Sequence, residues 1–310
     1  MKQLKKIGLL LLVTLSFISC NNDDGSPGNQ VPSSETFKNL FEAKLISMTQ
    51  AATFDASSTF TFTSAKGVKL TINGGCLRKA GAPVTGEVKL EFIEIFDRGD
   101  MLTSNKATMG KTATGEDRLL VSGGEFFIEA TQNGVVLTSD CFMQLEVPTA
   151  LSGGTDAAML PFAGTPNADG DIAWEQVTGV DFLVGSNPTT GQSTYYAFFN
   201  DFGWFNCDRF YDYSGPKTTI TSLVPAGYAG TNSFVFLASK DFPNSLGKSY
   251  GEFPVGMECY LIFVTEKDGK FRYAIKPSTP LTANHQVTFT LAETIVGTQE
   301  GLTAALNALP

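Results

Sequence analysis

Short runs of partly alternating apolar and polar residues recur along the chain and predict β-strands. The runs are rich in Val, Ile, Phe, Thr and Tyr, the residue types that favour strands. The predicted strands are FTFT (60–63), VKLTI (68–72), VKLEFIEIF (88–96), FFIEA (126–130), VVLTS (135–139), MQLEVP (143–148), TTITSLV (218–224), SFVFLAS (233–239), CYLIFVT (259–265), FRYAIK (271–276) and QVTFTL (286–291). Asn-Gly at 133–134 and Asp-Gly at 268–269 each join two of these runs, and both dipeptides favour two-residue hairpin turns.

Two helical patterns flank the strands. Apolar residues in 37–48 recur at helical spacing behind the possible cap residues Ser33 and Ser34, and a second such pattern, 302–309, follows Thr298. No helical pattern separates the strands from one another, which argues against a parallel α/β sheet. The sequence therefore predicts an all-β fold of two antiparallel β-sandwich domains, with short helices near the N- and C-termini.

A change in composition predicts the boundary between the two domains. Residues 149–194 are rich in Gly, Pro, Asn, Asp and Thr, and strand patterning resumes at Lys217. We interpret 36–202 as an N-terminal β-sandwich that includes this loop-rich segment, and 203–310 as a C-terminal β-sandwich domain.

The N-terminus has the plan of an export signal. Three lysines precede an apolar run at 7–18, which is too short to cross a bilayer as a helix. The pair Ser19-Cys20 resembles the lipobox of bacterial lipoproteins, although Phe17 replaces the usual leucine. The resemblance implies that 1–19 is a signal peptide and that Cys20 carries the lipid. The alternative is an uncleaved anchor with a chance cysteine.

The composition of the next residues predicts a flexible tether, and two of its acidic residues bear on where in the cell the protein lies. Residues 20–35 hold Cys20 and a polar, turn-forming segment that behaves as a flexible linker. Asp23 and Asp24 resemble the acidic export signal of Bacteroidota surface lipoproteins, which implies a lipid-anchored protein of the outer membrane, exposed at the cell surface. Any tether also needs solubilising charge, so the choice of leaflet stays open.

Charge and motif content narrow the classes of function. The formal net charge is −9, and no run of Lys and Arg supplies the basic face that nucleic acid requires. His285 is the sole histidine, and neither a nucleophile elbow nor a zinc-protease motif is present. Glu125 and Glu129 would share one strand face, as two acids on any solvated strand do, so we predict no enzyme, cofactor or metal.

Four cysteines lie beyond Cys20 and leave the redox state open. An even number in an exported chain allows two disulfides in three connectivities, and each cysteine also lies in or beside an apolar run, as buried free thiols do. These cysteines are Cys76, Cys141, Cys207 and Cys259.

An aromatic segment is the strongest candidate for ligand binding. Ten of the nineteen residues from Tyr195 to Tyr213 are aromatic, against 11% of the whole chain. One interpretation is a platform for sugar rings or peptide, and the favoured alternative is a core at the domain junction. The candidate binding residues are Tyr195, Tyr196, Trp204, Asn206, Asp208 and Arg209.

Two shorter motifs carry less weight. Arg98-Gly99-Asp100 spells the tripeptide that integrins recognise and could lie at an exposed turn. Residues 167–171 (NADGD) have the alternate spacing of a calcium loop but lack the glycine and glutamate that complete an EF-hand, so a polar turn is the better interpretation.

Four stretches resemble a family of uncharacterised Bacteroidota lipoproteins. They are GEVKLEF (86–92), DML (100–102), SGGEFFIEA (122–130) and GWFNCDRF (203–210), and the similarity covers most of 50–310. The resemblance implies an N-terminal sandwich akin to the ZU5 domain, followed by a second small β domain, in a lipidated and exported protein. It implies no activity, and ZU5 domains mediate protein–protein contacts, which favours a binding role.

Together these observations predict a lipid-anchored, non-catalytic binding or assembly module with a glycan or protein ligand. The alternative is a fimbria-like subunit that assembles by donating a strand to an open sheet edge. A glycoside hydrolase that uses carboxylates is less favoured, and the oligomeric state stays open.

Overall fold

Strands dominate the computed structural model, which describes residues 30–167, 170–179, 182–187 and 189–310. About 49% of the residues are in strands and 14% in helices, so the predicted all-β class is confirmed. The chain divides into a unit of Met1–Val31 and a unit of Pro32–Pro310, and every described helix and strand belongs to the second. Cys20 lies outside the described residues.

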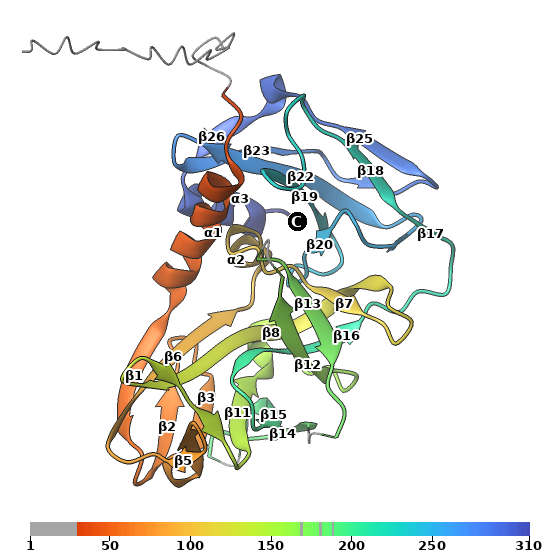
Figure 1. The fold of residues 1–310 in the computed structure, drawn as a ribbon. Coiled ribbons are helices and arrows are strands. Elements are labelled where there is room, and N and C mark those ends of the chain that lie inside the picture. Colours follow the sequence, from red (N-terminus) through yellow and green to blue (C-terminus); the bar gives the residue numbers. More distant parts are fainter. Residues whose placement is uncertain (1–29, 168–169, 180–181, 188) are drawn as a thin grey trace, which may run out of the picture. The chain divides into compact units, whose positions relative to one another are not determined.

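The largest sheet, sheet A, has eight strands with β8 near its centre (Figure 1). Its neighbours are antiparallel except β13 and β7, which are parallel. In sheet order, the strands are β1 (Gln50–Asp55), β6 (Glu87–Ile95), β8 (Asp117–Gln132), β16 (Gly203–Phe210), β12 (Leu160–Pro166), β13 (Ile172–Gln176) and β7 (Met109–Lys111), with β9 (Val135–Val136) paired to β8.

A second sheet, sheet B, packs against one face of sheet A. Its five antiparallel strands are β14 (Phe182–Ser186), β15 (Ser193–Phe199), β11 (Met143–Pro148), β3 (Lys69–Asn73) and β2 (Thr59–Thr63). Phe92 and Phe126 of sheet A share one hydrophobic core with Leu70 and Leu145 of sheet B. Burial alternates along β11, as the period of two in its sequence predicts.

The C-terminal third forms a six-stranded sheet, sheet C, and several short strand pairs. Sheet C contains β20 (Gly247–Lys248), β19 (Ser233–Ser239), β22 (Glu258–Lys267), β23 (Lys270–Ile275) and β26 (Ile295–Gly297), with β24 (Thr279–Pro280) paired to β22. The short pairs are β17 (Lys217–Thr218) with β21 (Phe253–Pro254) and β18 (Ile220–Leu223) with β25 (His285–Thr288). Earlier in the chain, β10 (Thr138–Ser139), β4 (Leu77–Lys79) and β5 (Ala82–Pro83) form a small three-stranded sheet. β18 and β25 are parallel, unlike the antiparallel pairs that the sequence predicts.

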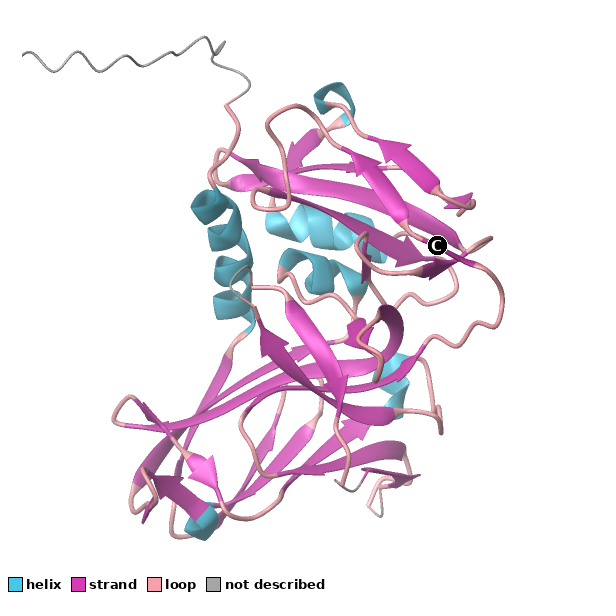
Figure 2. Cartoon of the chain, turned by 45° about the vertical axis from the view of Figure 1, so that its right-hand side comes forward, coloured by secondary structure: helices cyan, strands magenta, loops and turns pink. Residues whose placement is uncertain are grey.

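In the part of the chain that the structure describes, three α-helices accompany the strands (Figure 2). The two predicted helices are present as α1 (Ser34–Met48), whose N-cap is Ser33, and α3 (Gln299–Asn307), whose N-cap is Thr298. The third helix, α2 (Arg98–Thr103), was not predicted, because its six residues are too few for a helical period to emerge. Three 3₁₀ helices span Gly74–Cys76, Thr149–Ser152 and Leu291–Glu293.

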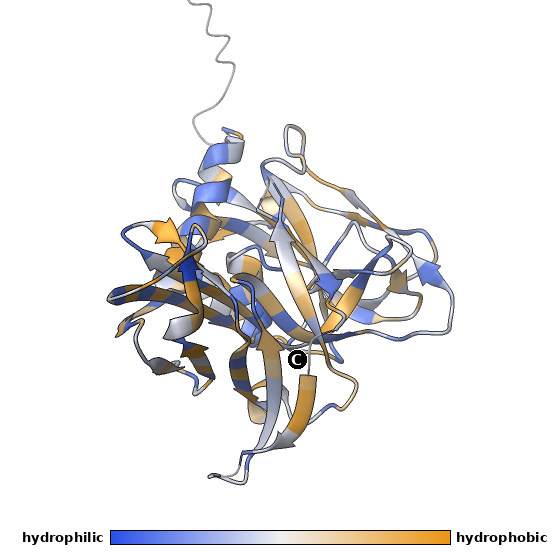
Figure 3. Cartoon of the chain, turned by 60° about the horizontal axis from the view of Figure 1, so that its bottom comes forward, coloured by the Kyte–Doolittle hydropathy of each residue, from blue (hydrophilic) through white to orange (hydrophobic). Residues whose placement is uncertain are grey.

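The helices belong to a second hydrophobic core on the other face of sheet A. Phe162 and Ile95 of sheet A share this core with Phe263 of sheet C, Phe37 of α1 and Leu302 of α3. The middle of sheet A is therefore covered on both faces. Figure 3 shows alternating hydrophilic and hydrophobic bands along many strands, whereas residues 119–126 of β8 are buried at every position.

The hairpin predictions are confirmed. Asn133-Gly134 joins β8 to β9 and Asp268-Gly269 joins β22 to β23, with φ between 52° and 73° at all four residues. The division into two domains stays a prediction. β16, placed at the start of the C-terminal domain, pairs with β8 and β12 and so lies in the same sheet as the N-terminal strands.

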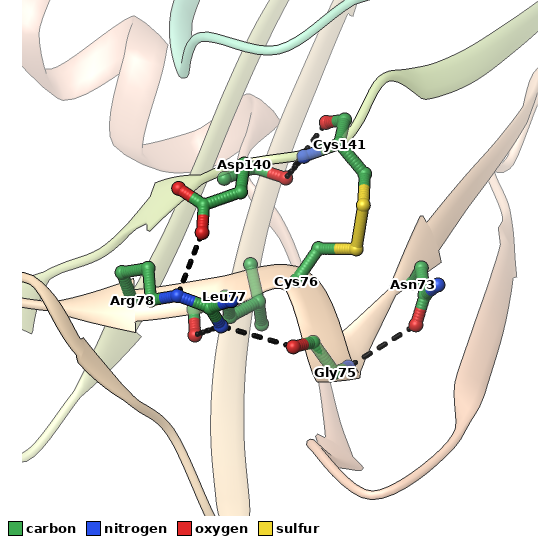
Figure 4. Close-up of a disulfide and its surroundings, with 8 residues drawn as sticks. Asn73, Gly75, Cys76, Leu77, Arg78, Asp140 and Cys141 are labelled. Carbon is green, nitrogen blue, oxygen red and sulfur yellow. Dashed lines mark hydrogen bonds and ion pairs between the residues drawn. A yellow bond between two sulfur atoms is a disulfide. The ribbon is translucent and has the colours of Figure 1, made fainter.

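One disulfide joins Cys76 to Cys141, with their Cα atoms 5.6 Å apart (Figure 4). Arg78 Nε lies 2.7 Å from Asp140 Oδ2, so an ion pair bridges the two segments beside the disulfide. The other two cysteines, Cys207 and Cys259, are buried free thiols. The structure thus selects one of the pairings that the sequence left open and leaves the second disulfide unformed.

Candidate functional site

A cavity of about 310 Å³ lies between β12, β15 and β16. We call it the aromatic cavity, because rings from all three strands and from the β15–β16 connection line it. These residues are Phe162, Phe198, Phe199, Phe202, Trp204 and Phe205. The polar residues of the lining include Thr165, Asn200, Asp201 and Asn206. An apolar cavity with a few polar groups is the usual form of a small-molecule site.

The cavity exists because the chain changes sheets at this point. β15 belongs to sheet B and β16 to sheet A, so the short connection at 200–202 crosses from one sheet to the other. Phe199, at the end of β15, stacks on Phe205 of β16 with ring centroids 4.1 Å apart. The aromatic segment recognised in the sequence therefore forms both a junction between sheets and the wall of a cavity.

Most of the predicted binding residues are buried. Tyr195, Asn206 and Asp208 are at most 1% exposed and Trp204 is 8% exposed, so they form no open platform. The core interpretation, which the sequence also allowed, describes them better, because Tyr195 packs in the core between sheets A and B and Trp204 packs in the core on the other face of sheet A. Trp204 and Asn206 still line the aromatic cavity.

Tyr195 and Arg209 meet through Asp156, a residue that the sequence did not single out. The Tyr195 hydroxyl accepts a hydrogen bond from Asp156 N at 2.8 Å, and Arg209 Nε donates to Asp156 Oδ2 at 2.6 Å. Burial opposes ionisation, but the hydrogen bonds from Arg209 and Ala158 hold the pKa of Asp156 below its ordinary value. Asp156 thus ties β15 to β16, while Tyr196 is half-buried outside this group.

A buried polar cluster lies beside the cavity on sheet A. Asn206 Nδ2 donates to Asp208 Oδ2 at 2.6 Å, and the Ser122 hydroxyl donates to Asn206 Oδ1 at 3.3 Å. Glu125 lies directly opposite Asn206 in the β8–β16 ladder and is fully buried. The cluster forms at a β-bulge, where the three steps from Ser122 to Glu125 on β8 face the two steps from Asn206 to Asp208 on β16.

The electrostatics of this cluster are unusual for carboxyl groups. Neither oxygen of Glu125 accepts a hydrogen bond from a described residue. Burial, and then the nearby Asp208, raise the pKa of Glu125 well above its ordinary value. Burial also raises the pKa of Asp208, against the hydrogen bonds from Ser122, Gly123 and Asn206.

Lys106 completes the cluster from a loop that the sequence did not single out. It is 3% exposed, lies 5.1 Å from the ring centroid of Trp204 and donates to the Gly170 carbonyl at 3.0 Å. Burial lowers its pKa to about 8, although Glu125 and Asp171 oppose the shift. Burial thus favours the neutral forms of Glu125 and Asp208, and neither carboxyl group faces solvent.

The remaining motifs singled out in the sequence form parts of a helix, a turn and a strand. Arg98 is 1% exposed and begins α2, so Arg98-Gly99-Asp100 does not lie at the exposed turn that an integrin motif would need, and α2 packs against α3. Asn167 and Gly170 form a turn in which Asn167 Oδ1 accepts from Asp171 N at 3.0 Å, while Asp169 lies outside the described residues. His285 begins β25, as predicted for the last strand run.

Within the described residues, no group of three or more His, Cys, Asp or Glu side chains is placed to hold a metal ion. Among the helices that the structure describes, none is long and apolar enough to cross a membrane. Comparisons of the chain with protein-family models, with curated proteins and with solved structures find no match.

Proposed function

We propose that this chain is an exported, lipid-anchored, non-catalytic binding module whose ligand enters the aromatic cavity. The observation that carries the proposal is the cavity itself. Its volume of about 310 Å³ is within the range of small-molecule sites, and rings dominate its lining. The chemistry of the lining suits a neutral, flat, apolar ligand group, such as an aromatic or short aliphatic moiety of a larger molecule.

Export is supported by the disulfide and by the N-terminal sequence. Disulfides persist in oxidising compartments outside the cytosol, and Cys76–Cys141 is such a bond. The proposed anchor is Cys20. In a Gram-negative host, the wild-type chain should partition into the detergent phase and incorporate a palmitate analogue, whereas Cys20→Ala should do neither. Label on Cys20→Ala would contradict the anchor.

Binding can be tested with a neutral apolar probe, N-phenyl-1-naphthylamine. Residues 21–310 with Trp174→Phe contain Trp204 as the sole tryptophan, and Trp204 lines the aromatic cavity. Bound probe should quench Trp204 emission by energy transfer in a saturable titration. Absence of saturable quenching would overturn the proposed site.

A matched pair of variants locates the probe. Ala197 lines the aromatic cavity, and Ala197→Phe should fill it and abolish the saturable quenching. Ala51 is an exposed residue of β1, and Ala51→Phe should leave the titration unchanged. Thermal unfolding by circular dichroism shows whether both variants fold. Equal quenching in the two folded variants would place the probe elsewhere.

A fimbria-like assembly subunit is the second candidate. β26 is an edge strand of sheet C, and its apolar residues Ile295 and Val296 are exposed. Open, apolar edges pair readily with another chain. This function would give oligomers that grow with concentration in size-exclusion chromatography and that Val296→Lys dissolves. A concentration-independent monomer would exclude it.

A further inference from the structure

A second hollow, of about 410 Å³, lies between β18, β19 and the turn after β20. We call it the polar cleft, because hydroxyl and charged groups gather in it. The lining residues that matter here are Asp171, Ser222, Ser233, Lys248, Ser249 and Tyr250. None of them is among the residues that line the aromatic cavity, so the two hollows are separate sites.

An ion pair forms one wall of the polar cleft. The ammonium group of Lys248 contacts Asp171 Oδ1, and it lies 3.4 Å from the ring centroid of Phe234. The Lys248 side chain is 3% exposed and that of Asp171 is 19% exposed. Asn105 Nδ2 also donates to Asp171 Oδ1, at 2.9 Å. The Asp171 carboxylate is therefore held in one orientation at the cleft.

Ser222 supplies an unsatisfied hydroxyl. Its Oγ is buried and has no hydrogen-bond partner among the residues that the structure describes. A buried hydroxyl without a partner costs free energy, so such a group in a cleft wall indicates that something else completes its hydrogen bond. Ser222 lies on β18, across the cleft from the turn that carries Ser249 and Tyr250.

Tyr250 supplies a flat apolar face. It is 50% exposed, although most large aromatic residues of the described chain are buried. A sugar ring has a C–H face, which packs on an aromatic surface, and hydroxyl groups, which exchange hydrogen bonds with polar side chains. The half-exposed ring of Tyr250, beside hydroxyl and carboxylate groups, offers both kinds of contact.

We infer that the polar cleft binds the ring of a neutral sugar. Tyr250 packs against the apolar face of the ring, Ser222 donates to or accepts from one hydroxyl, and the Asp171 carboxylate accepts from another. The charges of Asp171 and Lys248 compensate each other, which suits a neutral sugar. The volume of the cleft accommodates one or two sugar rings. This site is independent of the aromatic cavity and would stand if the proposed function there failed.

Saturation-transfer difference NMR tests this inference on residues 21–310. The probes are maltose, cellobiose and N,N′-diacetylchitobiose, each titrated separately. At least one should give saturable signals, strongest at ring protons that face Tyr250. Absence of saturable signals for all three would overturn the inference.

Exposed tyrosines provide a matched control. Tyr250→Ala should weaken binding of the active disaccharide about five- to tenfold, because it removes the stacking surface. Tyr213 is also exposed, at 39%, and lies outside the cleft, so Tyr213→Ala should leave the affinity unchanged. Equal affinities in both variants would overturn the site.

Ser222→Ala provides a second, milder test. Because Ser222 Oγ has no described partner to lose, the variant should fold normally and bind the disaccharide about two- to tenfold more weakly. Unchanged affinity in both Ser222→Ala and Tyr250→Ala would refute the assignment. Ala197→Phe should leave sugar binding intact, which separates this result from any outcome at the aromatic cavity.

Discussion

The guanidinium group of Arg98 donates from Nε to the Leu306 carbonyl at 3.0 Å, across 208 positions of sequence. The same group donates to the Ser239 carbonyl at 3.1 Å and to the Leu309 carbonyl. One buried side chain thus joins α2, sheet C and the end of α3. Carbonyl groups at a helix C-terminus need such donors, because they have no partners within the helix.

Replacement of Arg98 should therefore destabilise the whole unit. Arg98→Met removes three hydrogen bonds, those from the guanidinium group to the carbonyls of Ser239, Leu306 and Leu309, and we expect a loss of about 3 kcal/mol or more in the free energy of unfolding. Urea denaturation measures it. Arg118→Met, which removes a partly exposed pair with Glu116, should cost less than about 1 kcal/mol. Similar losses in the two variants would contradict the role of Arg98.

The disulfide should stabilise the fold measurably. Cys76 and Cys141 are 65 residues apart, and removal of a bond that closes such a loop costs about 2–4 kcal/mol. We expect the double variant Cys76→Ser/Cys141→Ser to unfold at lower urea than the wild type and to ignore added reductant. In denaturant, unreduced residues 21–310 should show two reactive thiols, Cys207 and Cys259. Four thiols would mean that the bond is absent.

The pH dependence of stability should report the buried carboxyl groups. Burial raises the pKa of Glu125 above 4.5 and that of Asp208 above 3.8. Between the pKa of each group in the unfolded chain and its higher pKa in the folded chain, the folded chain keeps a proton that the unfolded chain has lost. The stabilisation that these two groups contribute is therefore fully present at low pH and falls as pH rises toward the folded pKa. The slope is about 1.4 kcal/mol per pH unit for each such group.

Glu125→Gln removes one of these titrations while keeping the shape of the side chain. As pH rises from the ordinary pKa of Glu125 toward its raised pKa in the folded chain, the free energy of unfolding of the variant should fall less steeply than that of the wild type. The exposed residue Glu175 of β13 offers the control, and Glu175→Gln should retain the wild-type slope. Parallel curves for wild type and Glu125→Gln would show that Glu125 does not titrate abnormally.

Gly124 should tolerate no side chain. Its φ is +127°, and an added Cβ would lie 2.5 Å from a ring atom of Phe96. Gly115 also has a positive φ, +86°, but an added Cβ there would meet nothing within 4 Å. We expect Gly115→Ala to cost about 1–2 kcal/mol from backbone strain alone and Gly124→Ala to cost clearly more. Equal thermal shifts would contradict the steric difference.

The sequence predicts isolated strands and turns well, because their signals are local. MQLEVP (143–148) and SFVFLAS (233–239) match β11 and β19 at both ends. The alternation along β11 and the Asn-Gly turn after β8 need no information about distant parts of the chain.

The loop-rich segment shows where local patterns fail. Residues 149–194 contain β12, β13, β14 and part of β15, but β12 carries Pro161, Gly164 and Pro166, which usually interrupt strands. β16 escaped recognition for another reason. Sheet A is covered on both faces, so Trp204 and Cys207 are both buried and no alternation appears.

The aromatic stretch that lines the candidate site stood out in the sequence, but the sequence did not determine whether that stretch is a binding surface or a core. Aromatic density marked the stretch around Trp204 correctly, yet density does not distinguish a surface from a junction between sheets. Lys106 and Asp156 gave no signal, because their roles depend on partners about 20 and 50 residues away. Such partners are brought together by the strand order, which a single sequence does not encode in any short motif.

The contact between Arg98 and the end of α3 also bears on how the chain acquires its structure as it is synthesised. A chain that emerges N-terminus first presents Arg98 long before Leu306 and Leu309 arrive. Until then, one face of sheet A lacks Leu302 and Leu306, and the guanidinium group lacks two of its acceptors. The final residues thus complete this core last. A chain cut short before α3 would retain an exposed apolar surface that quality-control proteases recognise.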